Sequence, residues 1–170
     1  MYATPRTLFG LLLGLALPAA AEAGFTDPFA YCAAVGDVDA PDARFTGPAV
    51  PGAVSEGTVR LGLVAADAPQ EFREHTAWRC MGGRVWICSF GANIPCNDRA
   101  RTSKAPTKGM IAFCEENAGA SFVPAFATGR DTVYEWRCNG REPAIVRVVA
   151  KPDARGFLAE FWHELPAPSR

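Results

Sequence analysis

The sequence predicts a single compact domain of the α+β class that is braced by disulfides. Its 170 residues are 49% hydrophobic and 21% charged, it contains six cysteines, and short helix-like segments alternate with hairpin-like pairs of strands. This composition is too apolar for a disordered chain, and the length suits one domain. The formal net charge of -1 gives no overall field that would attract nucleic acid, so we expect no nucleic-acid partner.

The first 23 residues have the pattern of a cleaved signal peptide. Arg6 precedes an apolar run of about ten residues, which is too short to cross a hydrocarbon core about 30 Å thick. Ala21-Glu22-Ala23 offers a cleavage site, and cleavage after Ala21 is the alternative. We therefore assign residues 1–23 to the signal peptide and residues 24–170 to a periplasmic or extracellular domain with no membrane span.

The first helix is predicted directly after Asp27. Asp27 is a favourable N-cap, Pro28 suits the first helical position, and Gly36 can end the helix. Residues 36–70 are rich in proline and glycine, so they predict a long irregular connection with one short strand over 58–65.

Two β-hairpins are predicted farther along the chain. The first joins residues 76–80 to 84–88 around a Met-Gly-Gly turn, and the second joins 132–138 to 141–149. Asn139-Gly140 favours a type I′ turn in the second hairpin, because both residues tolerate positive φ.

Between and after the hairpins, two more elements are expected. A second helix begins near Thr107 and ends near Asn117. Pro143 cannot donate a hydrogen bond to a neighbouring strand, so it predicts an edge strand. Residues 157–165 close the chain as a strand, which their alternation favours, or as a short helix.

All six cysteines lie in the predicted exported part, and an even number suits structural disulfides in an oxidising compartment. The sequence contains no C-x-x-C pair and only two histidines, so it predicts neither a redox pair nor a metal site, and we expect no cofactor. The predicted disulfide residues are Cys32, Cys80, Cys88, Cys96, Cys114 and Cys138.

A repeated pattern narrows the choice of pairing. Trp78-Arg79-Cys80 recurs as Trp136-Arg137-Cys138, and each copy follows a cysteine-bearing helical segment and a loop with Phe and Pro. A duplication would give two pseudo-symmetric helix-plus-β-hairpin units, residues 27–96 and 108–165, that share one core. A chance match of a tripeptide is the alternative.

If the duplication holds, the two copies should contain equivalent disulfides. These would be Cys32–Cys80 and Cys114–Cys138, and Cys88–Cys96 would remain as a local bond.

Two histidines stand beside glutamates, His75 after Glu74 and His163 before Glu164. Such a pair could act as a general base in a small hydrolase if the two groups met in a cleft. The sequence has no nucleophile elbow, P-loop or dinucleotide fingerprint. We assign no catalytic residue and expect a protein that is not an enzyme, with the histidine hydrolase as an alternative.

The segment between Cys88 and Cys96 is a candidate recognition loop. It carries Phe90, Asn93 and Ile94, and a loop closed by a disulfide loses little entropy on binding. In the alternative interpretation, the phenyl and isoleucyl side chains fold back onto the core.

A basic run follows this loop and contains Arg99, Arg101, Lys104 and Lys108. These cations could meet an anionic surface such as phosphate, a lipid headgroup or an acidic protein. The alternative is a solvated loop.

The heptapeptide from Tyr134 to Gly140, together with Thr107-Lys108-Gly109, resembles the bacterial periplasmic inhibitors of C-type lysozyme. This resemblance implies a small antiparallel barrel and a lysozyme partner, with Lys108 as the base inserted into the lysozyme cleft. The sequence departs from the pattern, because Thr107-Lys108-Gly109 precedes the aromatic strand and begins a predicted helix.

These observations favour a non-enzymatic, disulfide-stabilised extracytoplasmic protein with a binding or accessory function. We expect its partner to be a protein or a component of the cell envelope. The alternatives are a lysozyme-inhibitor-like protein and the histidine hydrolase.

Overall fold

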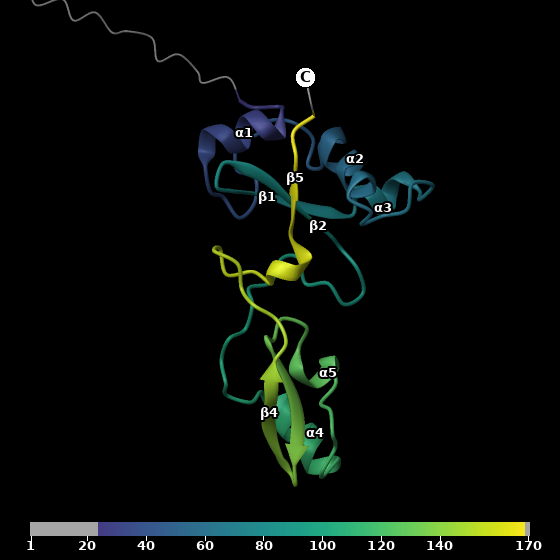
Figure 1. The fold of residues 1–170 in the computed structure, drawn as a ribbon, viewed down its shortest axis with the longest axis vertical. Helices are drawn as coiled ribbons and strands as arrows, with labels where there is room; N and C mark the ends of the chain where they lie inside the picture. The colour runs from purple at the N-terminus through teal and green to yellow at the C-terminus, as the bar shows by residue number, and fades with distance from the viewer. Residues whose placement is uncertain (1–23, 169–170) are drawn as a thin grey trace, which may run out of the picture.

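The computed structural model describes residues 24–168 (Figure 1). The predicted signal peptide lies outside the described residues. The elements, in chain order, are α1 (Pro28–Val35), α2 (Gly52–Arg60), α3 (Gln70–Glu74), β1 (Thr76–Met81), β2 (Arg84–Ser89), α4 (Lys108–Glu116), α5 (Ala125–Thr128), β3 (Tyr134–Asn139), β4 (Glu142–Val148), the 3₁₀ turn η1 (Ala159–Phe161) and β5 (His163–Leu165). Helices with antiparallel sheets and three disulfides confirm the predicted fold class.

The strands form two antiparallel sheets, one of three strands in the order β1-β2-β5 and one formed by β3 and β4. The first sheet lies with α1, α2 and α3 in the upper part of Figure 1, and the second lies with α4 and α5 in the lower part. We call these parts the first and second units. The chain returns from the second unit to the first, where Leu165 of β5 pairs with Val85 of β2.

Local signals define α1 and the first hairpin as predicted. The Asp27 carboxylate accepts a hydrogen bond from the backbone N–H of Ala30 at 2.7 Å, and α1 ends at Gly36 with φ of 77°. Gly82 and Gly83 form the turn between β1 and β2 with φ of 61° and 74°. Two consecutive positive φ angles match a type I′ turn, which suits the right-handed twist of the strands.

The turn of the second hairpin lies one residue later than predicted. Asn139 pairs with Glu142, so Gly140 and Arg141 are the turn residues. Only Gly140 has positive φ, at 62°. Glycine at the first central position is typical of a type II′ turn, and this turn leaves Asn139 in the strand.

The strand expected over 58–65 is wrong, because α2 extends through Thr58 to Arg60. Val54 and Thr58 lie four residues apart on one face of this helix, and both are fully buried. Gly57 allows β5 to approach, since a Cβ there would lie 2.6 Å from Cδ1 of Leu165. This segment therefore packs its buried face into the cluster of the first unit, which includes Leu165.

The final segment contains both of the expected alternatives. Residues 159–161 form η1, and the favoured strand is present only over His163–Leu165.

Pro143 lies in β4, which has a strand neighbour only on its β3 side within residues 24–168.

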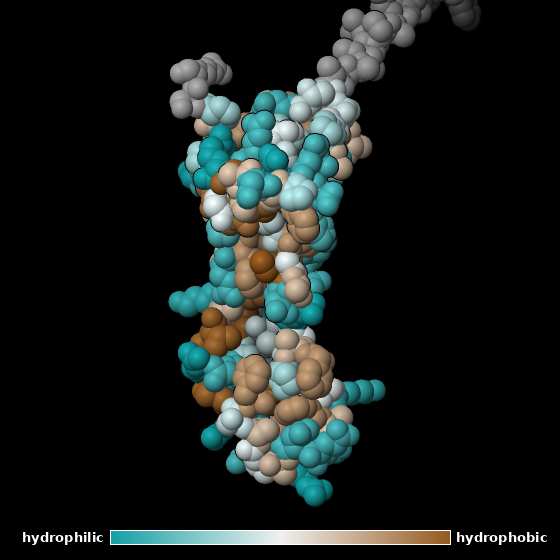
Figure 2. Space-filling view, turned by 90° about the vertical axis from the view of Figure 1, so that its right-hand side faces the viewer, coloured by the Kyte–Doolittle hydropathy of each residue, from teal (hydrophilic) through white to brown (hydrophobic). Residues whose placement is uncertain are grey.

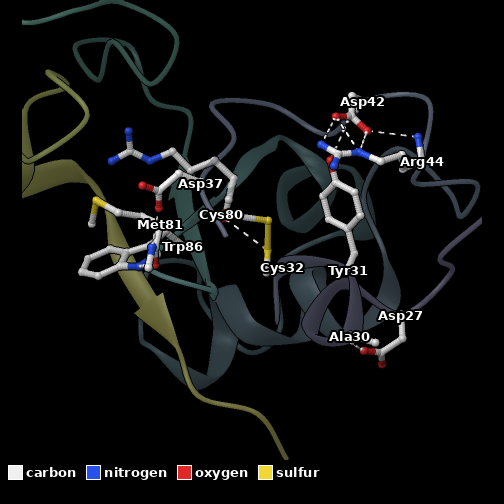
Figure 3. Close-up of a disulfide and its surroundings, with 12 residues drawn as sticks. Asp27, Ala30, Tyr31, Cys32, Asp37, Asp42, Arg44, Cys80, Met81 and Trp86 are labelled. Atoms are coloured by element: carbon white, nitrogen blue, oxygen red, sulfur yellow. Dashed lines mark hydrogen bonds and ion pairs between the residues drawn. A yellow bond between two sulfur atoms is a disulfide. The ribbon is translucent and has the colours of Figure 1, made fainter. Parts of the chain in front are cut away.

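The disulfides pair as the repeated pattern predicts. Cys32–Cys80 joins α1 to β1 (Figure 3), and Cys114–Cys138 joins α4 to β3. Cys88–Cys96, which we call the clip, closes a loop at the end of β2. No cysteine of the described chain is free. Three disulfides are consistent with an oxidising, extracytoplasmic location.

The buried apolar residues form separate clusters. The first unit packs around Tyr31, Trp78 and Ile87, whereas the second packs around Met110 and Trp136. Because each unit has its own cluster and the sheets differ in strand number, a pseudo-symmetric arrangement around one shared core is not confirmed. Within residues 24–168, no helix has the length and apolar character that crossing a bilayer requires.

Candidate functional site

The predicted recognition loop lies largely against the body of the protein. Phe90 stacks on His75 with ring centroids 5.0 Å apart, and both Phe90 and Ile94 pack on the cluster that contains the clip and Trp162. Both side chains are half-buried, as in the alternative in which they fold back, whereas Asn93 at the loop tip is exposed.

The predicted basic run does not form one free cationic surface. Arg99 forms an ion pair with Asp39, and Arg101 pairs with Asp131 at 2.8 Å. The pKa of the Asp39 carboxyl is below its ordinary value. The main cause is its hydrogen bond with Arg155, and the positive charges of Arg155 and Arg99 lower the pKa further.

The two lysines of the basic run are separated from this ion-pair network. Lys104 is exposed in the chain between the units, and Lys108 is the first residue of α4. The structure therefore does not bring the four predicted cations together.

The arginine of the first Trp-Arg-Cys tripeptide is completely buried. The Arg79 guanidinium lies between the rings of Phe157 and Trp162, 4.3 and 4.0 Å from their centroids, and pairs with Asp153. Burial lowers the pKa of this guanidinium. Its position joins β1 to the C-terminal segment, which indicates a structural role. Arg137, at the matching place in the second tripeptide, is exposed.

The histidines do not form the arrangement that the hydrolase alternative requires. His75 is exposed at the end of α3, and His163 is half-buried in β5. In the described chain neither imidazole forms an ion pair or a hydrogen bond with a carboxylate. Glu164, the neighbour of His163, pairs instead with Arg84 at 2.9 Å.

A different surface, on the second unit, is hollowed. A hollow of about 300 Å³ lies between β3, α5 and the clip loop, and we call it the aromatic groove. Its lining residues are Asn93, Phe122, Val123, Ala125, Thr128, Gly129, Arg130, Thr132, Tyr134, Glu135, Trp136 and Val149.

Large apolar side chains stand exposed on the same unit. The exposed fractions are 59% for Phe122, 84% for Phe126, 58% for Val148 and 45% for Val149. We call these four residues the apolar rim, since two of them line the groove and the other two are their neighbours in α5 and β4. Figure 2 shows apolar side chains gathered over the lower unit.

Backbone pairing places the two phenyl rings at the surface. The N–H of Val123 donates to the carbonyl of Trp136 at 2.8 Å, so this segment runs along the edge of β3. Val123 is buried, and its neighbour Phe122 points outward, as alternation in an extended chain requires. Pro124 then caps α5, a four-residue helix that carries Phe126.

The aromatic side chains of the groove have their polar atoms paired within the protein. The Trp136 indole N–H donates to Oγ1 of Thr132 at 3.3 Å, and the Tyr134 hydroxyl donates to the carbonyl of Thr102 at 3.1 Å. These hydrogen bonds hold the two aromatic side chains in place and leave none of their polar atoms without a partner.

Sequence reasoning found only one member of this surface, Asn93. Phe122 and Phe126 belong to the loop with Phe and Pro in the second copy of the repeated pattern. Their spacing around Pro124 is the only feature of the sequence that points to this surface. That spacing does not reveal that both rings remain exposed. The other predicted loop residues, Phe90 and Ile94, line a smaller hollow of about 240 Å³ beside His163.

A comparison with known protein families, curated proteins and solved structures finds no match. The structure also lacks the single barrel that the resemblance to lysozyme inhibitors implies, because its strands form two separate sheets and Lys108 lies in a helix rather than on a loop. The fold and disulfides define the class: a disulfide-stabilised α+β protein of the extracellular type.

Proposed function

We propose that this is a non-enzymatic, extracytoplasmic binding protein whose aromatic groove receives a segment of a partner protein. The observation that carries the proposal is the exposure of Phe122, which lines the groove, and of Phe126, which lines the neighbouring hollow. Since a large aromatic side chain presents roughly 150–250 Å², these two rings leave on the order of 300 Å² of apolar surface exposed. The largest apolar patch on a typical monomer is of this size, and such a patch is often functional.

The shape of the surface favours a protein over a membrane as the partner. A bilayer surface cannot fill a hollow, whereas a single protruding side chain can enter it and contact Phe122 and Tyr134. The disulfide between Cys114 and Cys138 fixes the wall of the groove, and the clip restricts the loop that carries Asn93. A site held in this way loses little conformational entropy on binding.

The test is selection of a random dodecapeptide library displayed on phage against the folded, oxidised protein. We expect peptides that bind the wild type at least about ten-fold better than a Phe122→Ser/Phe126→Ser variant, because ring contacts at the centre of an interface contribute about 1.4 kcal/mol or more.

Phe72→Ser is the matched control, because Phe72 is 57% exposed on α3 in the first unit. This control should bind the selected peptides as the wild type does. Selection that yields no peptide, or peptides that bind all three proteins equally, would exclude the groove as a polypeptide site.

A further inference from the structure

We infer that the aromatic groove prefers a partner segment in which an apolar side chain lies next to a carboxylate, and that Arg130 recognises the carboxylate. This inference rests on the proposed function and specifies the chemistry of the partner. The apolar side chain would occupy the hollow beside Phe122 and Tyr134. The carboxylate would then lie at the rim, where Arg130 follows α5.

The charges around the groove support this assignment. Glu135 also lines the groove, but its carboxylate pairs with Arg147 at 2.6 Å. Arg130 is exposed, and within residues 24–168 it has no carboxylate partner within ion-pair distance. The uncompensated charge of the groove is therefore positive, which complements a carboxylate and disfavours a cationic segment.

The position of Arg130 also limits where the carboxylate can lie. Arg130 lines both the groove and a neighbouring hollow, and the two hollows also share Ala125 and Gly129. That second hollow contains Asp98 and Asp131, and Asp131 already pairs with Arg101. Because Asp98 would repel an incoming acid there, the favourable place for the carboxylate is on the groove side of Arg130.

The amino acids that Arg130 prefers can be read from the phage selection itself. The recovered peptides are sequenced in bulk, and the ratio of Asp and Glu to Asn and Gln beside the apolar residue is compared with that of the starting library. For the wild type we expect a ratio about three-fold above the library, which corresponds to a solvent-exposed ion pair of less than about 1 kcal/mol. Arg130→Ala should return the ratio to that of the library.

Arg141→Ala is the matched control, because Arg141 is another exposed arginine of the second unit that does not line the groove. It should keep the wild-type ratio. A ratio equal to that of the library, in peptides that still require Phe122 and Phe126, would overturn the carboxylate preference and leave the proposed function standing. An acidic preference that persisted in Arg130→Ala would overturn the role of Arg130 in the same way. Failure to recover any groove-dependent peptide would instead overturn both the preference and the proposed function.

Discussion

Asp153→Asn tests whether the buried ion pair with Arg79 holds the C-terminal segment on the first unit. The substitution removes the negative charge but preserves an oxygen that can accept from the backbone N–H groups of Arg155 and Phe157, now at 2.8 and 3.1 Å. Leaving one member of a buried pair without its partner destabilises a protein by about 3–5 kcal/mol.

The lower end of this range applies here, because the charge of Asp39 also attracts the Arg79 guanidinium. We therefore expect Asp153→Asn to lower the free energy of unfolding by about 3 kcal/mol, or Tm by about 6–12 °C in a chain of this size. The assay is guanidinium unfolding of the oxidised protein, followed by tryptophan fluorescence, since Trp162 stacks on Arg79.

Two further variants separate charge from packing. Arg79→Met keeps a long apolar side chain between the rings, and in the double variant with Asp153→Asn neither charge remains. The double variant should be destabilised by at least about 1.5 kcal/mol less than the sum of the single losses, as expected for residues in contact.

Arg137→Met is the matched control for these variants. Arg137 occupies the same place in the second tripeptide but is exposed, so its replacement should change stability by less than about 0.5 kcal/mol. If Asp153→Asn proved as mild as Arg137→Met, the buried pair would not be the link between β1 and the C-terminal segment.

The remaining predictions concern acid stability, proteolysis and the disulfides. The folded-state pKa of Asp39 is lowered, so its contribution is present at neutral pH and lost as the pH falls below the unfolded-state value of about 4. Asp39→Asn should therefore flatten the acid limb of the stability curve, and an unchanged limb would contradict this. Endoproteinase Lys-C should cut first after Lys104, in an exposed segment that no disulfide spans. The fragments should separate on a denaturing gel without reductant but co-elute under native conditions, because β5 crosses between them; separate native elution would refute that pairing. A disulfide that closes a longer loop removes more conformational entropy from the unfolded chain, and Cys32–Cys80 spans 48 positions against 8 for the clip. Replacing both cysteines of Cys32–Cys80 with alanine should therefore lower the unfolding free energy by about 4 kcal/mol, against about 2.5 kcal/mol for the clip. The reversed order of losses would contradict this.

Most features that sequence reasoning predicted correctly depend on neighbouring residues, and the disulfide pairing was predicted from the repeated pattern. Asp27, Pro28 and Gly36 define α1 through backbone preferences that act within one or two turns. The glycines of the first hairpin act in the same local way. The repeated tripeptides predicted the disulfide pairing because each lies downstream of a cysteine-bearing helix.

Apart from the turn of the second hairpin, the features that were missed involve contacts between distant residues. Val54 of α2 packs in a cluster with residues that are distant in the sequence, among them Trp78 and Leu165. The apolar rim could not be predicted, because the exposure of Phe126 depends on which other parts of the chain pack against it. Arg79 and Arg137 show the same limit, since one tripeptide produces a buried ion pair in one place and a solvated side chain in the other.

The location of the proposed site follows from the unequal use of the C-terminal segment. This segment completes the first unit, where β5 adds a third strand beside β2 and Phe157 closes over Arg79. The second unit has a sheet of two strands, and its apolar rim remains exposed. A partner that contacts the rim would therefore bury apolar surface that this protein leaves in water, and burial of that surface would drive association. For the same reason, we expect substitutions in the first unit to affect stability, and substitutions in the apolar rim to affect binding with little change in stability.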